Sequence, residues 1–480
     1  MTKHLEILKV VSRKDRLELI RDYRMVVLII LILMLALASI VNSYERLGRY
    51  SVDRAIATQQ ERQSWLSQGD RDPHSAAHFA QWTFRPLVPT SMLDPFAIDY
   101  AGTAIWLEAH ARNPAAVRPV ESRASSLDVG QLSIGWILQA LGPVLAFLLG
   151  SGVISKEKQN GTLRLMIANG IVPQAVFIAK LQSLFFTIVL IVSPIFIVGL
   201  IAVFNVPTDF TLDSAIRFSL WVLFHVAWLG LAVCLAVAVS ALTGTQARSV
   251  MILLSIWAIA VLLIPRAISG TAEVLYPTPS GAQFWAQVRS DINNGINNSG
   301  DRKQREEALE RALFAKYNVA SRDELPISFR GAVLDANERF GNTVFEKHYL
   351  ALEDIYSQQR SLMRFGGLFT PFISLQNISA ALAGSDNHHL NHFNAQAETE
   401  RQRVVNALNR DLVLHSVGKS NYTADENLWA SFEVFEPVNM PVIEAVRGIV
   451  IDVIIMFTWL CIVIFILVRA KTRLSNEFGQ

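Results

Sequence analysis

The chain has 480 residues, of which 51% are hydrophobic and 18% are charged, and its mean hydropathy is +0.32. This mean is high for a soluble protein and low for one built only of membrane helices, so it predicts a membrane protein with a large water-exposed part. The net charge of +2 gives no support for nucleic-acid binding. The two cysteines, Cys234 and Cys461, both lie in apolar runs, which excludes a disulfide framework and a zinc–cysteine cluster.

The first element that we expect is a basic amphipathic helix over residues 1–24. Residues 3–24 carry seven Lys or Arg, and their apolar residues recur roughly at helical spacing, which is typical of a helix on the inner face of a membrane. A secretory signal peptide is the alternative, but the basic region is long and no convincing small-residue cleavage site follows the first apolar run. We therefore predict that residues 25–43 form a retained first span with its N-terminus in the cytosol.

Further apolar runs are long enough to cross a bilayer. Six spans with both termini in the cytosol place every basic cluster consistently on the inner side. The predicted fold class is therefore an all-α polytopic membrane protein. The spans expected after the first are residues 131–153, 174–204, 217–242, 249–269 and 446–468, followed by a basic cytosolic tail at 469–480.

Two long polar regions interrupt the spans, and both are expected outside the cytosol. Residues 44–130 contain no run that could span, and their prolines disfavour long helices, so we predict a small domain or an elaborated loop. Residues 270–445 are numerous enough for a core of their own and rich in helix formers, so we predict a mostly helical region. Within it, residues 366–384 are nearly long enough for a seventh span. Their polar side chains favour a buried or re-entrant segment instead, and a crossing there would place the basic tail outside.

The loop over residues 154–173, between the second and third spans, is the most informative stretch. It opens with charged and polar residues, and Gly161 then starts an amphipathic run that carries Leu163 and Met166 on one side. Pro173 suits the first turn of the following helix. A short helix between two spans, ringed with charge, suits contact with a soluble partner. The simpler alternative is an ordinary charged loop.

At these residues the sequence resembles the permeases of ABC-2-type transporters. Glu157, the run Gly161-Thr162-Leu163, a following proline and Lys180 match the pattern E-x-x-x-G-T-L … P … K of that family. The insert before the last span resembles a subfamily known only through a domain of unknown function, which says nothing about substrate.

The resemblance implies a permease subunit in the bacterial cytoplasmic (inner) membrane, most simply an exporter. It would pair with a second permease subunit, the same chain or a related one, and with two copies of a cytosolic ABC ATPase subunit that bind ATP and magnesium. In that family the loop forms a coupling helix that docks on the ATPase. Glu157 and Arg164 would make polar contacts there, and Leu163 and Met166 would fill a groove. The coupling residues implied are Glu157, Gly161, Thr162, Leu163, Arg164 and Met166.

No motif for catalysis is found in the sequence. The phosphate-binding pattern G-x-x-x-x-G-K-[ST] is absent, so we expect no ATP binding by this chain, no cofactor and no enzymatic activity of its own. His388 and His392, one helical turn apart, are weak candidates for metal ligands. The simpler interpretation is a solvated helix start capped by Asp386.

Ionisable residues within the spans are candidates for a substrate pathway or for contacts inside the bundle. His225 lies in the middle of the fourth span, and Asp452 is close enough in sequence to Arg447 to pair with it. No row of charges crosses the membrane, which disfavours a proton-coupled carrier or an ion channel. Two other classes stay open, a non-transporting membrane sensor or scaffold with a helical external domain, and a lipid-modifying enzyme. The second of these lacks any recognisable catalytic set.

Overall fold

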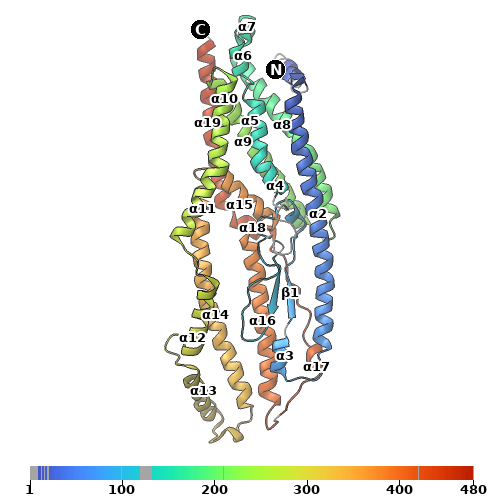
Figure 1. The fold of residues 1–480 in the computed structure, drawn as a ribbon, viewed down its shortest axis with the longest axis vertical. Helices are drawn as coiled ribbons and strands as arrows, with labels where there is room; N and C mark the ends of the chain where they lie inside the picture. The colour runs from blue at the N-terminus through green and yellow to red at the C-terminus, as the bar shows by residue number, and fades with distance from the viewer. Residues whose placement is uncertain are drawn as a thin grey trace.

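The computed structural model describes the chain except residues 1–8, 12, 16, 19–20, 80, 99, 119–131, 209, 420 and 479–480. The molecule is elongated, and both chain ends lie at one end of it beside α6 and α7, whereas α13 and α17 lie toward the other (Figure 1). We call these the loop end and the distal end. The helix predicted over residues 1–24 falls only partly within the described residues, which are helical over 9–11, 13–15, 17–18, 21 and 23–24.

In the part of the chain that the structure describes, six helical segments are long and apolar enough to cross a membrane, which is the number predicted. Four of them are single helices, and two are interrupted by a π-helical turn. The segments are α2 (Tyr23–Leu66), then α4 (Ile134–Trp136) with η4 (Ile137–Leu141), α5 (Gly142–Gly150) and α6 (Ser155–Gln159), then α8 (Pro173–Asn205), α9 (Leu212–Leu242), α10 (Gln246–Trp257) with η5 (Ala258–Leu263) and α11 (Ile264–Leu275), and α19 (Val450–Phe478).

The helix that contains the predicted first span, residues 25–43, is much longer than that span. Helix α2 has 44 residues and continues to Leu66. No proline occurs in this stretch, so nothing in it breaks the helix once it has started. At its far end the Trp65 indole donates a hydrogen bond to the carbonyl of Trp429 at 3.0 Å, and its ring packs edge-on against Trp429 and Phe432. This tertiary contact stabilises the helical extension, which is too polar to cross a membrane.

The rest of the first polar region is small and mixed. It contains α3 (Pro73–Phe79), a 3₁₀ turn η1 (Pro89–Met92) and one antiparallel pair of strands, β1 (Gln81–Phe84) and β2 (Ala104–Leu107). The strands pair with Trp82 opposite Trp106, and the two rings lie 5.2 Å apart.

The second span is irregular near its middle, because the π-helical turn η4 lies directly before Gly142-Pro143. Two indoles donate to carbonyls in the turn, Trp228 to Gln139 at 3.1 Å and Trp257 to Ala140 at 2.8 Å. The backbone groups that the irregular turn exposes are therefore satisfied inside the bundle, as burial away from water requires.

The second polar region is mostly helical, as predicted. Its segment over Pro371–Ala383 is buried, and Phe372, Leu375 and Ile378 join the apolar core of the bundle. The helices are α12 (Gly281–Asn294), α13 (Arg302–Tyr317), α14 (Phe329–Gly366), α15 (Pro371–Ala383), α16 (Asn387–His415), α17 (Glu426–Ala430) and α18 (Val442–Gly448).

Candidate functional site

The loop between the second and third spans folds into two short helices, α6 and α7 (Thr162–Ala168). Gly161 lies between them with φ of 73°, in the left-handed region that only glycine adopts at little cost. A Cβ atom at this position would meet nothing within 4 Å, so the backbone conformation alone requires glycine. Gly161 therefore allows the tight turn between α6 and α7.

Three residues of the signature, Glu157, Thr162 and Lys180, meet in one partly buried ion network. Glu157 is 7% exposed, and its Oε1 accepts a hydrogen bond from Lys14 at 2.5 Å, while its Oε2 accepts one from the Thr162 hydroxyl. Lys180, from the third span, lies 3.5 Å from the same Oε1 and donates to Asp15 at 2.7 Å. The network therefore joins the N-terminal segment, the loop and α8. Sequence spacing alone does not predict contact between these three parts of the chain.

The groove-filling role predicted for Leu163 is wrong for this conformation. Leu163 is fully buried in the core of its own bundle, and Met166 packs against the same core. The apolar side of α7 covers the end of the bundle, because that surface would otherwise face water. Glu157 also faces inward, so neither it nor Leu163 is free to touch a partner. The outward side of α7 carries Arg164 and Leu165, and Leu165 is 64% exposed.

The loop is also tied to the fourth and sixth spans. Lys158 donates to the carbonyl of Ala241 at 2.8 Å and to the Glu477 carboxylate at 2.7 Å. The Ser240 hydroxyl accepts the backbone N–H of Ser155 at 3.0 Å. Movement of the loop must therefore move α8, α9 and α19 with it, or break these contacts.

A buried polar chain runs through the bundle around His225. The Nδ1 of His225 lies 2.8 Å from the carbonyl of Trp221, and its Nε2 lies 3.4 Å from the amide nitrogen of Gln139. Gln139 in turn donates to Asp94 at 3.2 Å, and the Ser379 hydroxyl donates to the same carboxylate oxygen at 2.5 Å. His225 is thus part of a bundle contact, one of the two roles considered from the sequence. The sequence reading missed Asp94, although an acid among apolar neighbours is a usable signal.

The predicted pairing of Asp452 with Arg447 is wrong. Arg364 donates to Asp452 at 3.0 Å and Asn377 donates to its other oxygen at 2.8 Å, so the partners come from α14 and α15. Arg447 is exposed in the last turn of α18, which ends at Gly448 before α19 begins. The two residues therefore do not share one continuous helix, on which the spacing argument depended.

His388 and His392 do not form a metal site with a third ligand in the described part of the chain. Asp386 caps α16 as the simpler interpretation required, since it accepts the backbone N–H of His389 at 3.1 Å. His389 is the buried member of this run, and it lies between Asp386 at 2.5 Å and Arg217 at 3.2 Å. Burial lowers the pKa of His389 below its ordinary value, although Asp386 opposes this effect.

Arg217 is fully buried and joins the bundle to the helices beyond it. It donates to the Asp213 carboxylate at 2.6 Å and to the carbonyls of Ala381 at 3.1 Å and Met440 at 2.6 Å. Since a guanidinium has only donors, the Nε2 of His389 accepts from it and the Nδ1 of His389 donates to Asp386. The sequence placed Arg217 at the start of a span and gave no sign of these partners.

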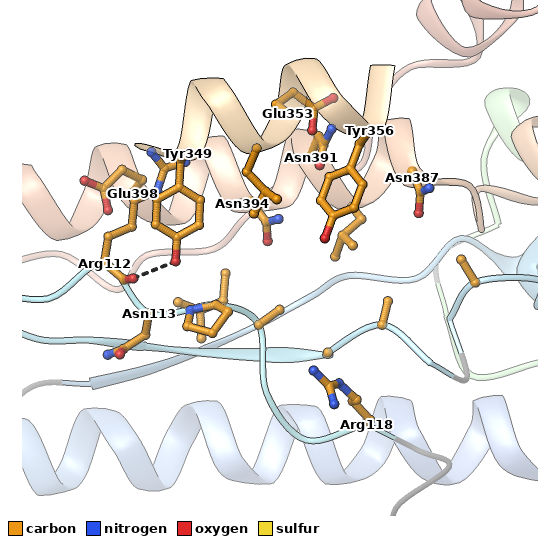
Figure 2. Close-up of a pocket in the computed structure, with 18 of the residues that line it drawn as sticks. Arg112, Asn113, Arg118, Tyr349, Glu353, Tyr356, Asn387, Asn391, Asn394 and Glu398 are labelled. Carbon is orange, nitrogen blue, oxygen red and sulfur yellow. Dashed lines mark hydrogen bonds between the residues drawn. The ribbon is translucent and has the colours of Figure 1, made fainter. Parts of the chain in front are cut away.

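A pocket of about 450 Å³ opens between the β2 segment and helices α14 and α16 (Figure 2). Tyr349 and Tyr356 reach into it from α14, and Asn391 and Asn394 face it from α16. The Tyr349 hydroxyl donates to the carbonyl of Arg112 at 2.9 Å, and the Arg112 guanidinium lies 4.3 Å from the Tyr349 ring. Burial raises the pKa of Tyr349 to about 12, so this hydroxyl keeps its proton at neutral pH. Aromatic faces with amides and guanidinium groups suit a polar organic ligand.

A family model described as Domain of unknown function (DUF3526) matches residues 281–437, which contain α12 to α17. No curated protein matches the chain. The match covers the helices beyond the fifth span and assigns no activity to them.

Proposed function

We propose that this chain is the permease subunit of an ABC-2-type ATP-binding cassette transporter. It would export its substrate across the bacterial inner membrane, with the loop end in the cytosol. The observation that carries the proposal is the convergence of Glu157, Thr162 and Lys180, three signature residues, in one ion network under α7. Burying the Glu157 carboxylate and the Lys180 ammonium is costly, and an ordinary charged loop has no need of such a buried pair.

The geometry suggests how ATP-driven motion would reach the membrane helices. A cytosolic ATPase subunit, holding ATP and magnesium, would dock on the outward side of α7, where Arg164 and Leu165 are exposed. The buried anchors, Glu157 with Lys180 and Lys158 with Glu477, would then pass the displacement to α8 and α19. A second permease subunit, the same chain or a related one, would complete the pathway in the surrounding lipid.

The test is association of this chain with a co-expressed cytosolic ABC ATPase subunit. Leu165→Asp places a charge on the proposed docking surface without touching the core, and we expect it to reduce binding of the ATPase by at least about 10-fold, the effect of losing one apolar anchor. Leu414→Asp is the matched control, because Leu414 is a 50% exposed leucine at the C-terminal end of α16, and it should bind like wild type. Binding is measured on purified full-length protein in detergent, together with ATP turnover. Equal binding by wild type and Leu165→Asp would remove α7 as the docking surface.

A non-transporting sensor is the second candidate, and the pocket beneath Tyr349 and Tyr356 favours it. Under this function the pocket would bind a polar ligand and no ATPase would be required. Wild-type protein that neither binds the ATPase nor changes its turnover would make this the leading function. An ATPase that binds through Leu165 would exclude it.

A further inference from the structure

Three histidines from two separate segments converge near the distal end of the molecule. His74 and His78 lie on α3, and His110 follows β2. The Nε2 atom of His74 lies 3.3 Å from Nε2 of His78 and 3.3 Å from Nε2 of His110. The three ligand atoms all lie within 4.8 Å of one another. We propose that these residues bind one Zn²⁺ ion per chain through their Nε2 atoms.

The spacing fits the size of such a site. Zn²⁺ binds imidazole nitrogen at about 2.0–2.1 Å in a tetrahedral arrangement, which places two ligand nitrogens about 3.3–3.4 Å apart. Two of the nitrogen pairs already have this separation. Helical spacing provides one of them, because residues four positions apart on α3 share a face.

The helix α3 is held in place without using its histidine rings. The Asp72 carboxylate caps it, accepting the backbone N–H groups of His74 at 2.9 Å and Ser75 at 3.2 Å. Ala76 and Ala77 are buried in the apolar cluster around Trp65. The ring nitrogens of His74 and His78 are therefore not needed to hold α3 and can serve as metal ligands.

His110 has the support that metal-binding histidines commonly have. Both its backbone N–H, at 3.0 Å, and its Nδ1, at 2.7 Å, contact one oxygen of Glu338. Arg401 holds the other Glu338 oxygen at 2.8 Å, and both side chains are 1% exposed. Because an ionised carboxylate only accepts, Nδ1 of His110 carries the proton and Nε2 presents its lone pair to the cluster. The left-handed φ of 62° at His110, unusual for a residue with a side chain, is part of this arrangement.

A second feature lies behind His74. Its Nδ1 is buried without a hydrogen bond of good geometry, and so are both polar atoms of the Asn409 side chain, which is fully buried. The Asn409 side chain lies beside the His74 imidazole. A zinc-bound His74 keeps its proton on Nδ1, and Asn409 then offers the acceptor that this proton needs.

Hydrogen bonds among the rings do not explain the cluster by themselves. Nε2 of His74 faces two other Nε2 atoms but can direct only one proton, and His110 has already placed its proton on Nδ1. One of the two contacts is therefore left without a well-placed proton. A cation accepts all three lone pairs at once.

The donor set also selects the ion. Imidazole nitrogens suit Zn²⁺ and similar transition metals, whereas Mg²⁺ and Ca²⁺ prefer oxygen ligands. His78 is exposed and the His110 side chain is 41% exposed, so an ion can enter from solvent. Three protein ligands leave a fourth position open to water or to a donor atom of a bound molecule.

The experiment measures Zn²⁺ binding by full-length protein purified in detergent and stripped with a chelator. We expect one equivalent of Zn²⁺ for wild type, competition by Co²⁺ with the intense visible absorption of four-coordinate cobalt, and no competition by excess Mg²⁺. His78→Ala should weaken binding by at least about 100-fold, more than the loss of an outer contact. Glu338→Gln, in which the outer partner of His110 loses its charge, should weaken it by about 10- to 100-fold.

The control is the double variant His388→Ala, His392→Ala, which removes the other histidine pair with helical spacing and should bind like wild type. Thermal unfolding in the presence of chelator shows whether each variant is folded, so that weak binding is not mistaken for misfolding. The proposal is overturned if wild type binds less than about half an equivalent. It is also overturned if a folded His78→Ala binds as tightly as wild type, or if the control loses the ion.

Discussion

Replacing Arg217 with glutamine tests the contact between the membrane bundle and the helices beyond it. The change removes the donors for the Met440 carbonyl and for Nε2 of His389, which are 3% and 6% exposed as residues. Each buried acceptor left without a donor costs about 1–3 kcal/mol. Asp213 also loses its cation, but it is partly exposed and keeps the backbone N–H of Val442 at 2.6 Å. We therefore expect Arg217→Gln to lower the unfolding free energy by about 2–6 kcal/mol, the cost of two such buried acceptors.

The assay is denaturant unfolding of the purified chain in mixed micelles, followed by tryptophan fluorescence, to which Trp221 on the same helix contributes. Arg360→Gln is the matched control, because Arg360 pairs with Glu353 at the surface, where both side chains are about 40% exposed. Exposed pairs contribute about 0–1 kcal/mol, so this variant should unfold nearly as wild type does. If the two variants are equally stable, the reasoning about Arg217 is wrong.

Three further outcomes are expected. Gly161→Ala should destabilise the loop by about 1–2 kcal/mol through its positive φ alone, whereas Gly270→Ala, in a helix with open space around it, should be neutral or stabilising in the same thermal unfolding assay. Trp65→Ala should cost about 3–5 kcal/mol and speed hydrogen exchange in the distal half of α2, and unchanged exchange would contradict the account of that helix. The folded-state pKa of His389 lies below its ordinary value near 6.5, so its contribution to stability is complete above pH 6.5 and declines as the pH falls below it. His389→Gln should therefore reduce the dependence of the melting temperature on pH between pH 7.5 and 5. An unchanged pH dependence would refute this.

The spans could be predicted from the sequence because each is a long apolar run, and hydropathy alone fixes such segments. The end of the first helix could not be predicted in this way. Residues 44–66 are polar and have no apolar run, so what decides their structure is the absence of proline together with the docking of Trp65 on Trp429. That contact joins positions 364 residues apart. Local pattern reports on membrane burial but not on such tertiary contacts.

The candidate sites show the same limit. The loop signature identified Glu157 and Lys180, but not that Lys14 and Asp15 would complete their network, because nothing in the sequence relates the N-terminal segment to the loop. The side on which Leu163 lies was also misjudged, since an amphipathic pattern shows that a helix has an apolar face and not which neighbour covers it. Sequence spacing predicts contacts between residues of one helix. Contacts between residues of different helices can be identified only from the three-dimensional structure.

The unbroken helix α2 has a mechanical consequence. With 44 residues it is about 66 Å long at 1.5 Å per residue. A stiff rod of that length works as a lever: a tilt of about 5° at one end displaces the other by about 6 Å. A small tilt of α2 at the loop end would therefore produce a large displacement where Trp65 packs against Trp429. Loss of the Trp65 contact would leave α2 intact but would uncouple its motion from the distal helices.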